Sequence, residues 1–529
     1  MPKTAAALLT RRIAQSTGIV MASVLASRVL GFFREWTVAH QIGSNAVTDT
    51  YYAAFTLPDF LNYLVAGGSL SLTFIPVFAH YVAEQHEEEG WHVFSTVITF
   101  MGLSLAGLIL VAEIYAPRLV TVIAPGFNPA EKARLIFLTR LMLPAQLCFY
   151  LGGILSAVQY AKGQFVVPSL APVVYNLGII LGGVLLSSRI GITGFAVGVL
   201  AGALTGNFAL QVHGAKLAGM RFHPSLDLRH PGFKLFLKLA IPIMLALSLV
   251  FTDDWIIRWF GSYLVPASIT WLSYAKTLMR VPLGVVGQAV GVASFPVLAQ
   301  LYSEGRLEEL NRTLNSTLKG LLLFIVPVSA LTIAQSRPLV YLVFSHTRLR
   351  GPDLDATALA LAVFSLGMFA WSAQGILARG FYATRDTLTP AVAGTLLTLL
   401  SLPLYWLLVR RAQYLGLALA SSIGIIVYAA ALFVLLERRT ANCDAGGLLL
   451  FFAKMSAASA AAGLLSFRIV SWLETSVNWR TTHGAFLVLV VTSVIGLALT
   501  AVFAKLLRVR ELNRYFNRLA FRERTSSRS

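Results

Sequence analysis

The stretch that decides the fold is VLASRVLGFFREWTVAHQIG, Val24 to Gly43. Its apolar residues suit a helix in lipid, yet it carries Arg28, Arg34 and Glu35 inside the run. A charged side chain at the bilayer centre costs about 2.5–3.5 kcal/mol on insertion scales. These three residues are therefore expected to face a partner or a water-filled cavity.

The composition of the whole chain places this stretch in a membrane protein. Of 529 residues, 57% are hydrophobic and 12% are charged, whereas soluble domains have about 25% charged residues. Mean hydropathy is +0.73. The net charge of +19 lies mainly in segments that flank apolar runs, which is typical of a cytoplasmic membrane face rather than of a nucleic-acid-binding surface. We expect a multi-pass membrane protein whose basic segments lie on the cytoplasmic face.

Apolar runs define the expected topology. A spanning helix needs about 20 mostly apolar residues, and about fourteen such runs are present. Lys3, Arg11 and Arg12 at one end and the basic tail at the other predict that both termini are cytoplasmic. The connection SHTRLRGPDLD, residues 345–355, is basic although it falls outside in this topology.

An internal repeat predicts how the runs are grouped. GILSAVQYAKGQFVVP, Gly153 to Pro168, resembles GILARGFYATRDTLTP, Gly375 to Pro390, at an offset of 222. A second match relates the segments that begin at Thr50 and Thr270, at an offset of 220. We predict an all-α polytopic protein with two six-helix lobes and two C-terminal helices. The expected divisions are an N-terminal lobe (1–216), a C-terminal lobe (217–440), two C-terminal helices (441–508) and a basic cytoplasmic tail (509–529).

The charges of the opening stretch allow two interpretations. Arg28 and Glu35 are seven residues apart and share one stripe of the helix, whereas Arg34 lies roughly 120° away. The three can form a buried ion pair that holds the bundle. Alternatively, they can form a cationic cavity wall. Repeated halves around a midplane cavity are typical of alternating-access transporters.

Other apolar runs also carry charges. Lys276 and Arg280 are four residues apart and share a helix face, and Lys454 lies in the thirteenth run. Arginine suits phosphate oxygens, so a cationic cavity walled by apolar helices fits an anionic head group on a lipid tail. A further group, Asp253, Asp254 and Arg258, is expected either to bind a coupling cation or to form an ion pair.

No enzyme motif is present in the sequence. It lacks the phosphate-binding loop GxxxxGK[ST] and the zinc motif HExxH, and its nine histidines are scattered. We expect no catalytic residue, no metal and no cofactor. Transport would then be driven by the membrane potential or by a gradient of a monovalent cation.

Three segments resemble the MurJ/MviN family, the bacterial lipid II flippases. ASRVLGFFREWTVAHQIGSNAVTDTYYAAFTLPDFL follows the family's opening pattern, and FIPVFAHY and GFYATRDTLTP follow two later patterns. The similarity runs through the chain in order. The residues that fall on the opening pattern are Arg28, Arg34, Glu35, Asp49, Phe55, Leu57 and Pro58.

The resemblance implies a fold, a substrate and a mechanism. The fold would be that of the multidrug/oligosaccharidyl-lipid/polysaccharide exporters. The substrate would be lipid II, an undecaprenyl diphosphate that carries a disaccharide-pentapeptide. The protein would move it from the cytoplasmic to the outer leaflet for peptidoglycan synthesis. The expected substrate-binding residues are Arg28, Arg34, Glu35, Asp49, Lys276, Arg280 and Lys454, and the cell-wall synthesis machinery is an expected partner.

The sequence departs from the family pattern at cavity positions. Asn62 and Tyr63 stand where members carry arginine, and Thr277 replaces the arginine of the second lobe. Lys276 and Arg280 keep positive charge one to three residues away. The alternative is therefore an exporter of another prenyl-diphosphate-linked glycan or of an amphiphilic drug. A non-transporting scaffold would have no use for cations in a cavity.

Overall fold

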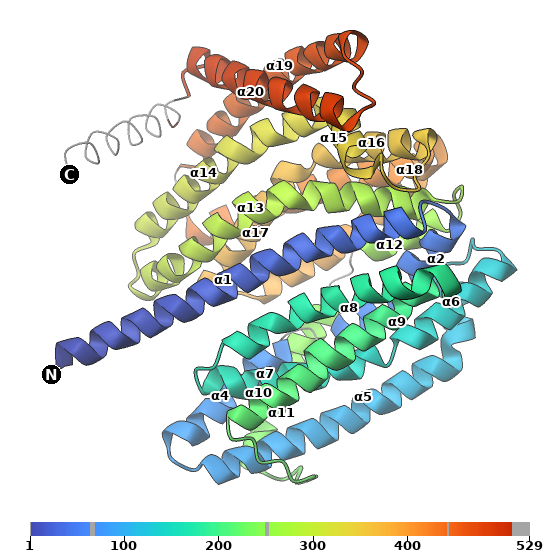
Figure 1. Ribbon diagram of the computed structural model, residues 1–529. Coiled ribbons are helices and arrows are strands. Elements are labelled where there is room, and N and C mark those ends of the chain that lie inside the picture. The colour runs from blue at the N-terminus through green and yellow to red at the C-terminus, as the bar shows by residue number, and fades with distance from the viewer. Residues whose placement is uncertain (1, 64–68, 249–252, 442–443, 510, 512–529) are drawn as a thin grey trace. The chain divides into compact units, whose positions relative to one another are not determined.

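The computed structural model describes residues 2–63, 69–248, 253–441, 444–509 and 511. Every regular element in these ranges is a helix (Figure 1). The chain divides into two compact units, residues 1–270 and 271–529. Gly67, Gly68, Cys443 and most of the predicted basic tail lie outside these ranges.

In its described residues, the first unit contains twelve α-helices, one π-helical segment and the start of a thirteenth α-helix. They are α1 (Pro2–Gln41), α2 (Ala46–Ala54), α3 (Thr56–Leu61), α4 (Ser69–Ala83), α5 (Glu87–Ile123), α6 (Pro129–Met142), α7 (Ala145–Ala161), α8 (Val166–Ile190), α9 (Thr193–Gly202), the π-helical segment Ala203–Ala209, α10 (Leu210–Leu217), α11 (Pro231–Ser248), α12 (Asp253–Gly261) and the first turn of α13 (Ser268–Ser303). α2 and α3 are separated at Phe55, and residues 64–68, between α3 and α4, lie outside the described ranges.

Glycines bring α8 and α9 together. A Cβ atom at Gly178 would lie 2.4 Å from the Cα of Gly202, and one at Gly182 would lie 2.5 Å from the Cα of Gly198. No side chain fits at these distances, so the two backbones touch. In lipid, where apolar surface alone gives no drive for association, such close packing is a main source of helix contact.

The second unit holds the rest of α13 and seven further helices. They are α14 (Leu307–Ala334), α15 (Ser336–Phe344), α16 (Gly351–Ser365), α17 (Met368–Ala383), α18 (Leu388–Thr440), α19 (Ala445–Ser476) and α20 (Thr482–Leu506). The long helix α18 is two helices joined by a kink at Gln413, where φ is 51° and ψ is −131°.

The turns of the two halves recur at the offsets of the sequence repeat. Four pairs of residues with positive φ are related by 220 or 222 positions: Gln85 and Gly305, Gly163 and Arg385, Gly191 and Gln413, and Gly219 and Ala441. The pair at Gly191 and Gln413 also shares ψ, −137° and −131°. This local correspondence supports the internal repeat. The lobe boundaries themselves stay a prediction, because the compact units divide at Thr270.

The helices are suited to a membrane. Within the described residues, eight helices are long and apolar enough to cross a bilayer, or nine if the bent pair α16 and α17 forms one span. The predicted all-α polytopic class is confirmed. The count of fourteen spans stays a prediction.

Candidate functional site

Arg34 and Glu35 form an ion pair on α1. Arg34 Nη2 lies 2.6 Å from Glu35 Oε1, and Nε donates to the same oxygen at 3.1 Å. The other carboxylate oxygen of Glu35 accepts a short hydrogen bond from the Tyr52 hydroxyl on α2. Glu35 is 7% exposed, so its charge is balanced where water cannot reach it. The ion pair of the first interpretation is thus present between Arg34 and Glu35, and the cavity wall stays a prediction.

A third helix holds the guanidinium from the other side. Asn176 on α8 accepts a hydrogen bond from Arg34 Nη1 at 3.3 Å, and its amide nitrogen donates to the Ser27 carbonyl and hydroxyl. Three of the five N–H groups of Arg34 are thus engaged. The Arg34 side chain is 28% exposed. The arrangement therefore leaves two donors for an incoming phosphate or carboxylate.

Arg28 does not join this network. It is exposed on α1, and it forms no hydrogen bond or ion pair within the part of the chain that the structure describes. The partner of Glu35 is its neighbour Arg34, not the residue that shares its stripe. The charge of Arg34 is therefore compensated by the adjacent Glu35 side chain.

Asp49 caps a helix. It lies on α2 with 2% of its surface exposed. Its carboxylate accepts hydrogen bonds from Ala267 N at 2.7 Å, Thr270 N at 2.8 Å and Thr270 Oγ1 at 2.6 Å. An acidic side chain in this position satisfies the free N–H groups that start α13. Its oxygens are therefore committed to the protein rather than offered to a ligand.

The partner of Arg258 is Asp59, which sequence reasoning missed. Arg258 Nη1 on α12 lies 3.1 Å from Asp59 Oδ2 and 3.3 Å from Thr56 Oγ1, both on α3. Asp253 and Asp254 lie at the start of α12, each partly buried. In the sequence, only one feature indicated Asp59. It directly follows Leu57 and Pro58, which fall on the family's opening pattern. Asn176 and Tyr52 had no signal, because neutral polar residues are common in such helices.

The cations of the second unit are dispersed. Lys276 on α13 is 5% exposed, and its ammonium lies 5.3 Å from the centre of the Phe364 ring. Arg280, one turn later, is exposed, and Lys454 on α19 is partly buried. Lys276 and Arg280 therefore differ in environment although they share a helix face.

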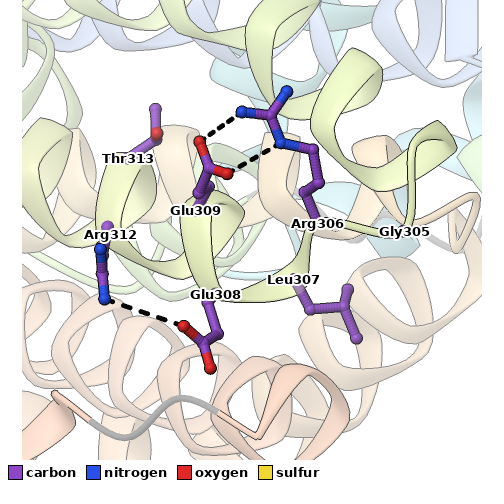
Figure 2. Close-up of a pocket in the computed structure, with 7 residues that line it drawn as sticks. All are labelled: Gly305, Arg306, Leu307, Glu308, Glu309, Arg312 and Thr313. Carbon is purple, nitrogen blue, oxygen red and sulfur yellow. Dashed lines mark hydrogen bonds and ion pairs between the residues drawn. The ribbon is translucent and has the colours of Figure 1, made fainter.

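A surface hollow follows α13 in the second unit. Figure 2 shows its lining, Gly305, Arg306, Leu307, Glu308, Glu309, Arg312 and Thr313. Arg306 binds both carboxylate oxygens of Glu309, at 2.8 and 2.6 Å, and lies 2.6 Å from Glu304. The charged side chains that line the hollow neutralise one another. No predicted site residue lines the hollow. Across the described ranges, no group of three His, Cys, Asp or Glu side chains is arranged to hold a metal ion.

The helices and their hydropathy define the class of protein: a polytopic all-helical membrane protein. A solved structure titled "Lipid II flippase MurJ, inward closed conformation" matches with a TM-score of 0.76 and 22% identity, covering 93% of this chain and 99% of that one. An inward-facing multidrug transporter of the MATE family, in the MOP superfamily, matches with a TM-score of 0.60 and 14% identity, covering 80% and 98%.

Sequence comparison defines the family. The family model "Lipid II flippase MurJ" matches residues 38–489. The chain is 28% identical over 467 residues to the lipid II flippase MurJ of Burkholderia cenocepacia, covering 86% of this chain and 89% of that protein. It is 24% identical over 510 residues to a probable lipid II flippase MurJ of Vibrio cholerae, covering 94% and 96%. The chain belongs to the MurJ family of lipid II flippases.

Proposed function

We propose that this chain moves lipid II from the cytoplasmic to the outer leaflet of the inner membrane by alternating access. The observation that carries the proposal is the match of the family model to residues 38–489, which takes in both compact units. The substrate's head group is a diphosphate with a sugar and peptide attached. Such a ligand needs a cation at membrane depth, and Arg34 supplies one.

The Arg34 network has the properties that a reversible phosphate site needs. Glu35 and Asn176 hold the guanidinium from two sides, so little side-chain freedom is lost when a phosphate binds. Glu35 also balances the charge of Arg34 when the site is empty, which lowers the cost of keeping the arginine in the membrane. The two free N–H groups of Arg34 would donate to phosphate oxygens. Arg28 lies two turns away on the same helix and would attract the diphosphate through its charge.

The second unit would complete the site. In this unit Thr277 stands in place of the arginine of the family pattern. The positive charge comes instead from Lys276, Arg280 and Lys454. The exposed Arg280 would meet the head group, while Lys276 would act through its charge from beneath the surface. The lobes 1–216 and 217–440 would rock around the substrate, and the helices of 441–508 would hold the prenyl tail. Both termini would be cytoplasmic.

The drive would come from the membrane potential or a gradient of a monovalent cation. We propose no enzymatic step and no cofactor, since transport needs only binding and a conformational change. The cell-wall enzymes that use lipid II would be functional partners in the outer leaflet.

Growth complementation tests the proposal. In a bacterium whose own lipid II flippase is depleted, the chain should sustain growth and normal cell shape. Purified chain in vesicles should move fluorescent lipid II to the opposite leaflet. If the chain reaches the membrane at the level of the host flippase, yet neither rescues growth nor moves lipid II, the proposal is rejected.

The alternative substrate has its own supporting observation. Asn62 and Thr277 remove two arginines of the family pattern, so the cavity can suit a different head group. The vesicle assay with undecaprenyl diphosphate linked to another glycan, or with an amphiphilic drug, separates the two. Faster transport of either compound than of lipid II would favour the alternative.

A further inference from the structure

One end of the second unit gathers six arginines that the proposed transport site does not use. They lie on α15, in the α15–α16 connection, at the kink of α18 and in the α19–α20 connection, and we call them the arginine end: Arg337, Arg348, Arg350, Arg410, Arg411 and Arg480. In Figure 1 the labels of α15, α16 and α18 lie together within this unit.

Specific contacts tie these connections to one another. Trp271 donates to Asp353 Oδ1 at 3.0 Å and packs on Tyr414 at 5.1 Å, which joins the α15–α16 connection to the kink of α18. His346 lies 2.5 Å from Thr482, and the Tyr341 ring packs on Trp479 at 5.3 Å. The six arginines therefore belong to one surface rather than to separate loops.

The charge of this surface is not neutralised by the protein. Only three acids lie in the same segments, Asp353, Asp355 and Glu474. Asp355 pairs with Arg337 at 3.9 Å, and Glu474 interacts electrostatically with Arg337 and Arg480. Asp353 accepts from Trp271 and from the Arg350 backbone N–H.

Four arginines remain without an acidic partner. Arg348, Arg350, Arg410 and Arg411 are exposed, and they form no ion pair with any residue that the structure describes. Such a surface suits an anionic partner from outside the chain.

The position of Arg410 and Arg411 indicates what this partner is. Leu396, Leu400 and Leu407 are exposed by 53%, 72% and 47%, and they form one stripe of α18 that leads to Arg411. An apolar stripe of this kind on a spanning helix faces lipid. The Arg410 guanidinium stacks 3.8 Å above the ring of Trp406, which is 50% exposed.

Tryptophan marks the level of the lipid head groups. A lipid fits both surfaces, because its phosphate would contact the arginines and its acyl chain would contact the leucine stripe. An acidic protein segment would contact the arginines alone.

We propose that the arginine end binds the phosphate of an anionic membrane lipid, with Arg410, Arg411 and Trp406 at its centre. Two lipids share this chemistry: a bulk phospholipid such as phosphatidylglycerol, and the prenyl diphosphate of the transported substrate. With both termini cytoplasmic, as in the proposed function, this end lies at the outer leaflet. The leaflet therefore rests on the proposed function. Binding itself depends on neither orientation nor transport.

The test measures lipid binding to the full-length purified chain in neutral detergent micelles. Phosphatidylglycerol, phosphatidylcholine and undecaprenyl diphosphate are titrated separately. Each arginine near a charged lipid surface contributes about 1 kcal/mol, so Arg410→Gln/Arg411→Gln should weaken phosphatidylglycerol binding by roughly tenfold or more. Arg410→Lys/Arg411→Lys should keep part of the affinity, because charge remains but the planar fork is lost.

Arg118→Gln is the matched control. Arg118 on α5 is also an exposed arginine over an aromatic ring, at 5.6 Å from the centre of Tyr115, but it stands alone. Its loss should change lipid binding less than twofold, as expected for one isolated surface charge. Equal losses for Arg118→Gln and for Arg410→Gln/Arg411→Gln would overturn the proposal.

The three lipids separate the sources of the phosphate. Parallel loss of phosphatidylglycerol and prenyl diphosphate binding supports a general lipid-phosphate site, and loss of only one assigns that lipid. The proposal fails if wild-type chain binds phosphatidylcholine as tightly as phosphatidylglycerol, or if Arg410→Gln/Arg411→Gln keeps all lipid binding and instead loses an acidic protein partner. Because no lipid is transported in this assay, its result stands apart from that of growth complementation.

Discussion

At the scale of single residues, charge balance decides how α1 can carry Arg34. Its neighbour Glu35, 7% exposed, accepts two of its hydrogen bonds, and Asn176 accepts a third from a position 142 residues later in the chain. The exposed Arg28 has no such arrangement. The two arginines therefore predict different effects when they are replaced.

Replacement of Arg34 tests this difference. Arg34→Ala leaves a buried carboxylate unpaired, which costs about 3–5 kcal/mol, so little folded protein should reach the membrane. Arg34→Gln/Glu35→Gln removes both charges and should fold at near wild-type yield, yet fail to support growth in the depleted host. Arg28→Ala should fold normally and transport more slowly. Fluorescence size-exclusion chromatography reports the yield. Full transport by the double variant at wild-type yield would show that Arg34 is structural only.

A second residue-scale prediction uses the repeat. Gly219 and Ala441 are related by 222 positions and both have positive φ, 84° and 50°. A left-handed conformation costs a non-glycine residue about 1–2 kcal/mol. Ala441→Gly should therefore raise the unfolding temperature, and Gly219→Ala should lower it, with free energies of about 1 kcal/mol each. Thermal unfolding followed by tryptophan fluorescence checks both; a shift of the same sign in the two variants would contradict the repeat-based explanation.

At the scale of elements, the segment GFYATRDTLTP shows why a family motif needs its polar residues. The connection between α17 and α18 turns at Arg385, where φ is 58°. Asp386 then accepts hydrogen bonds from Thr389 N at 2.9 Å and Thr389 Oγ1 at 2.7 Å, and pairs with Arg439 at 3.0 Å. Asp386 thus caps the start of α18, and its ion pair with Arg439 links this start to the end of the same helix.

Acid should weaken this cap. Burial alone would raise the pKa of Asp386, but the Thr389 hydrogen bonds and the Arg439 charge outweigh it and hold that pKa below its ordinary value. A depressed carboxyl pKa stabilises the folded state above the pKa of the unfolded chain, and this contribution is lost as pH falls through the folded value. Asp386→Asn should cost about 1 kcal/mol at neutral pH.

The pH dependence of Asp386→Asn provides the check. The difference in unfolding temperature between the variant and wild type should shrink as pH falls from about 7 to about 3, where the wild-type carboxyl gains a proton. Asp227→Asn, at an exposed aspartate of the first unit, is a control for general acid effects. A difference that stays constant over this range would show that the carboxylate charge is not what stabilises α18.

At the scale of the whole molecule, the first connections of the two repeats meet. Asp49 on α2 receives three hydrogen bonds from Ala267 and Thr270, which belong to the segment that matches it at an offset of 220. Only one repeat has an acid here, since Ile269 stands at the equivalent position. A contact of this kind can open and close as two lobes rock.

Spin labels test whether this contact moves during transport. Val47→Cys and Tyr263→Cys, in a background with Cys148→Ser and Cys443→Ser, place labels on its two sides. The distance between them should show two populations, and lipid II should shift their ratio. Asp49→Asn should favour the longer distance, because a neutral side chain holds the N–H groups of α13 less strongly. One unchanging distance in every condition would contradict alternating access for this pair.

The amino-acid sequence alone determined the class, the family resemblance and the repeat. Apolar runs of spanning length predict helices because a backbone in lipid must satisfy its own hydrogen bonds. The segment Gly153–Pro168 matches Gly375–Pro390 at an offset of 222, so the sequence also predicted the repeat.

Only the tertiary structure decided which charges pair. Arg258 binds Asp59, 199 residues away, and the carboxylate of Asp49 caps the start of α13. Helix periodicity gives the direction of a side chain around its own axis, but not which helix lies opposite. The partner of a charge in a membrane is chosen by the packing of distant helices, because an unpaired charge there is too costly to leave.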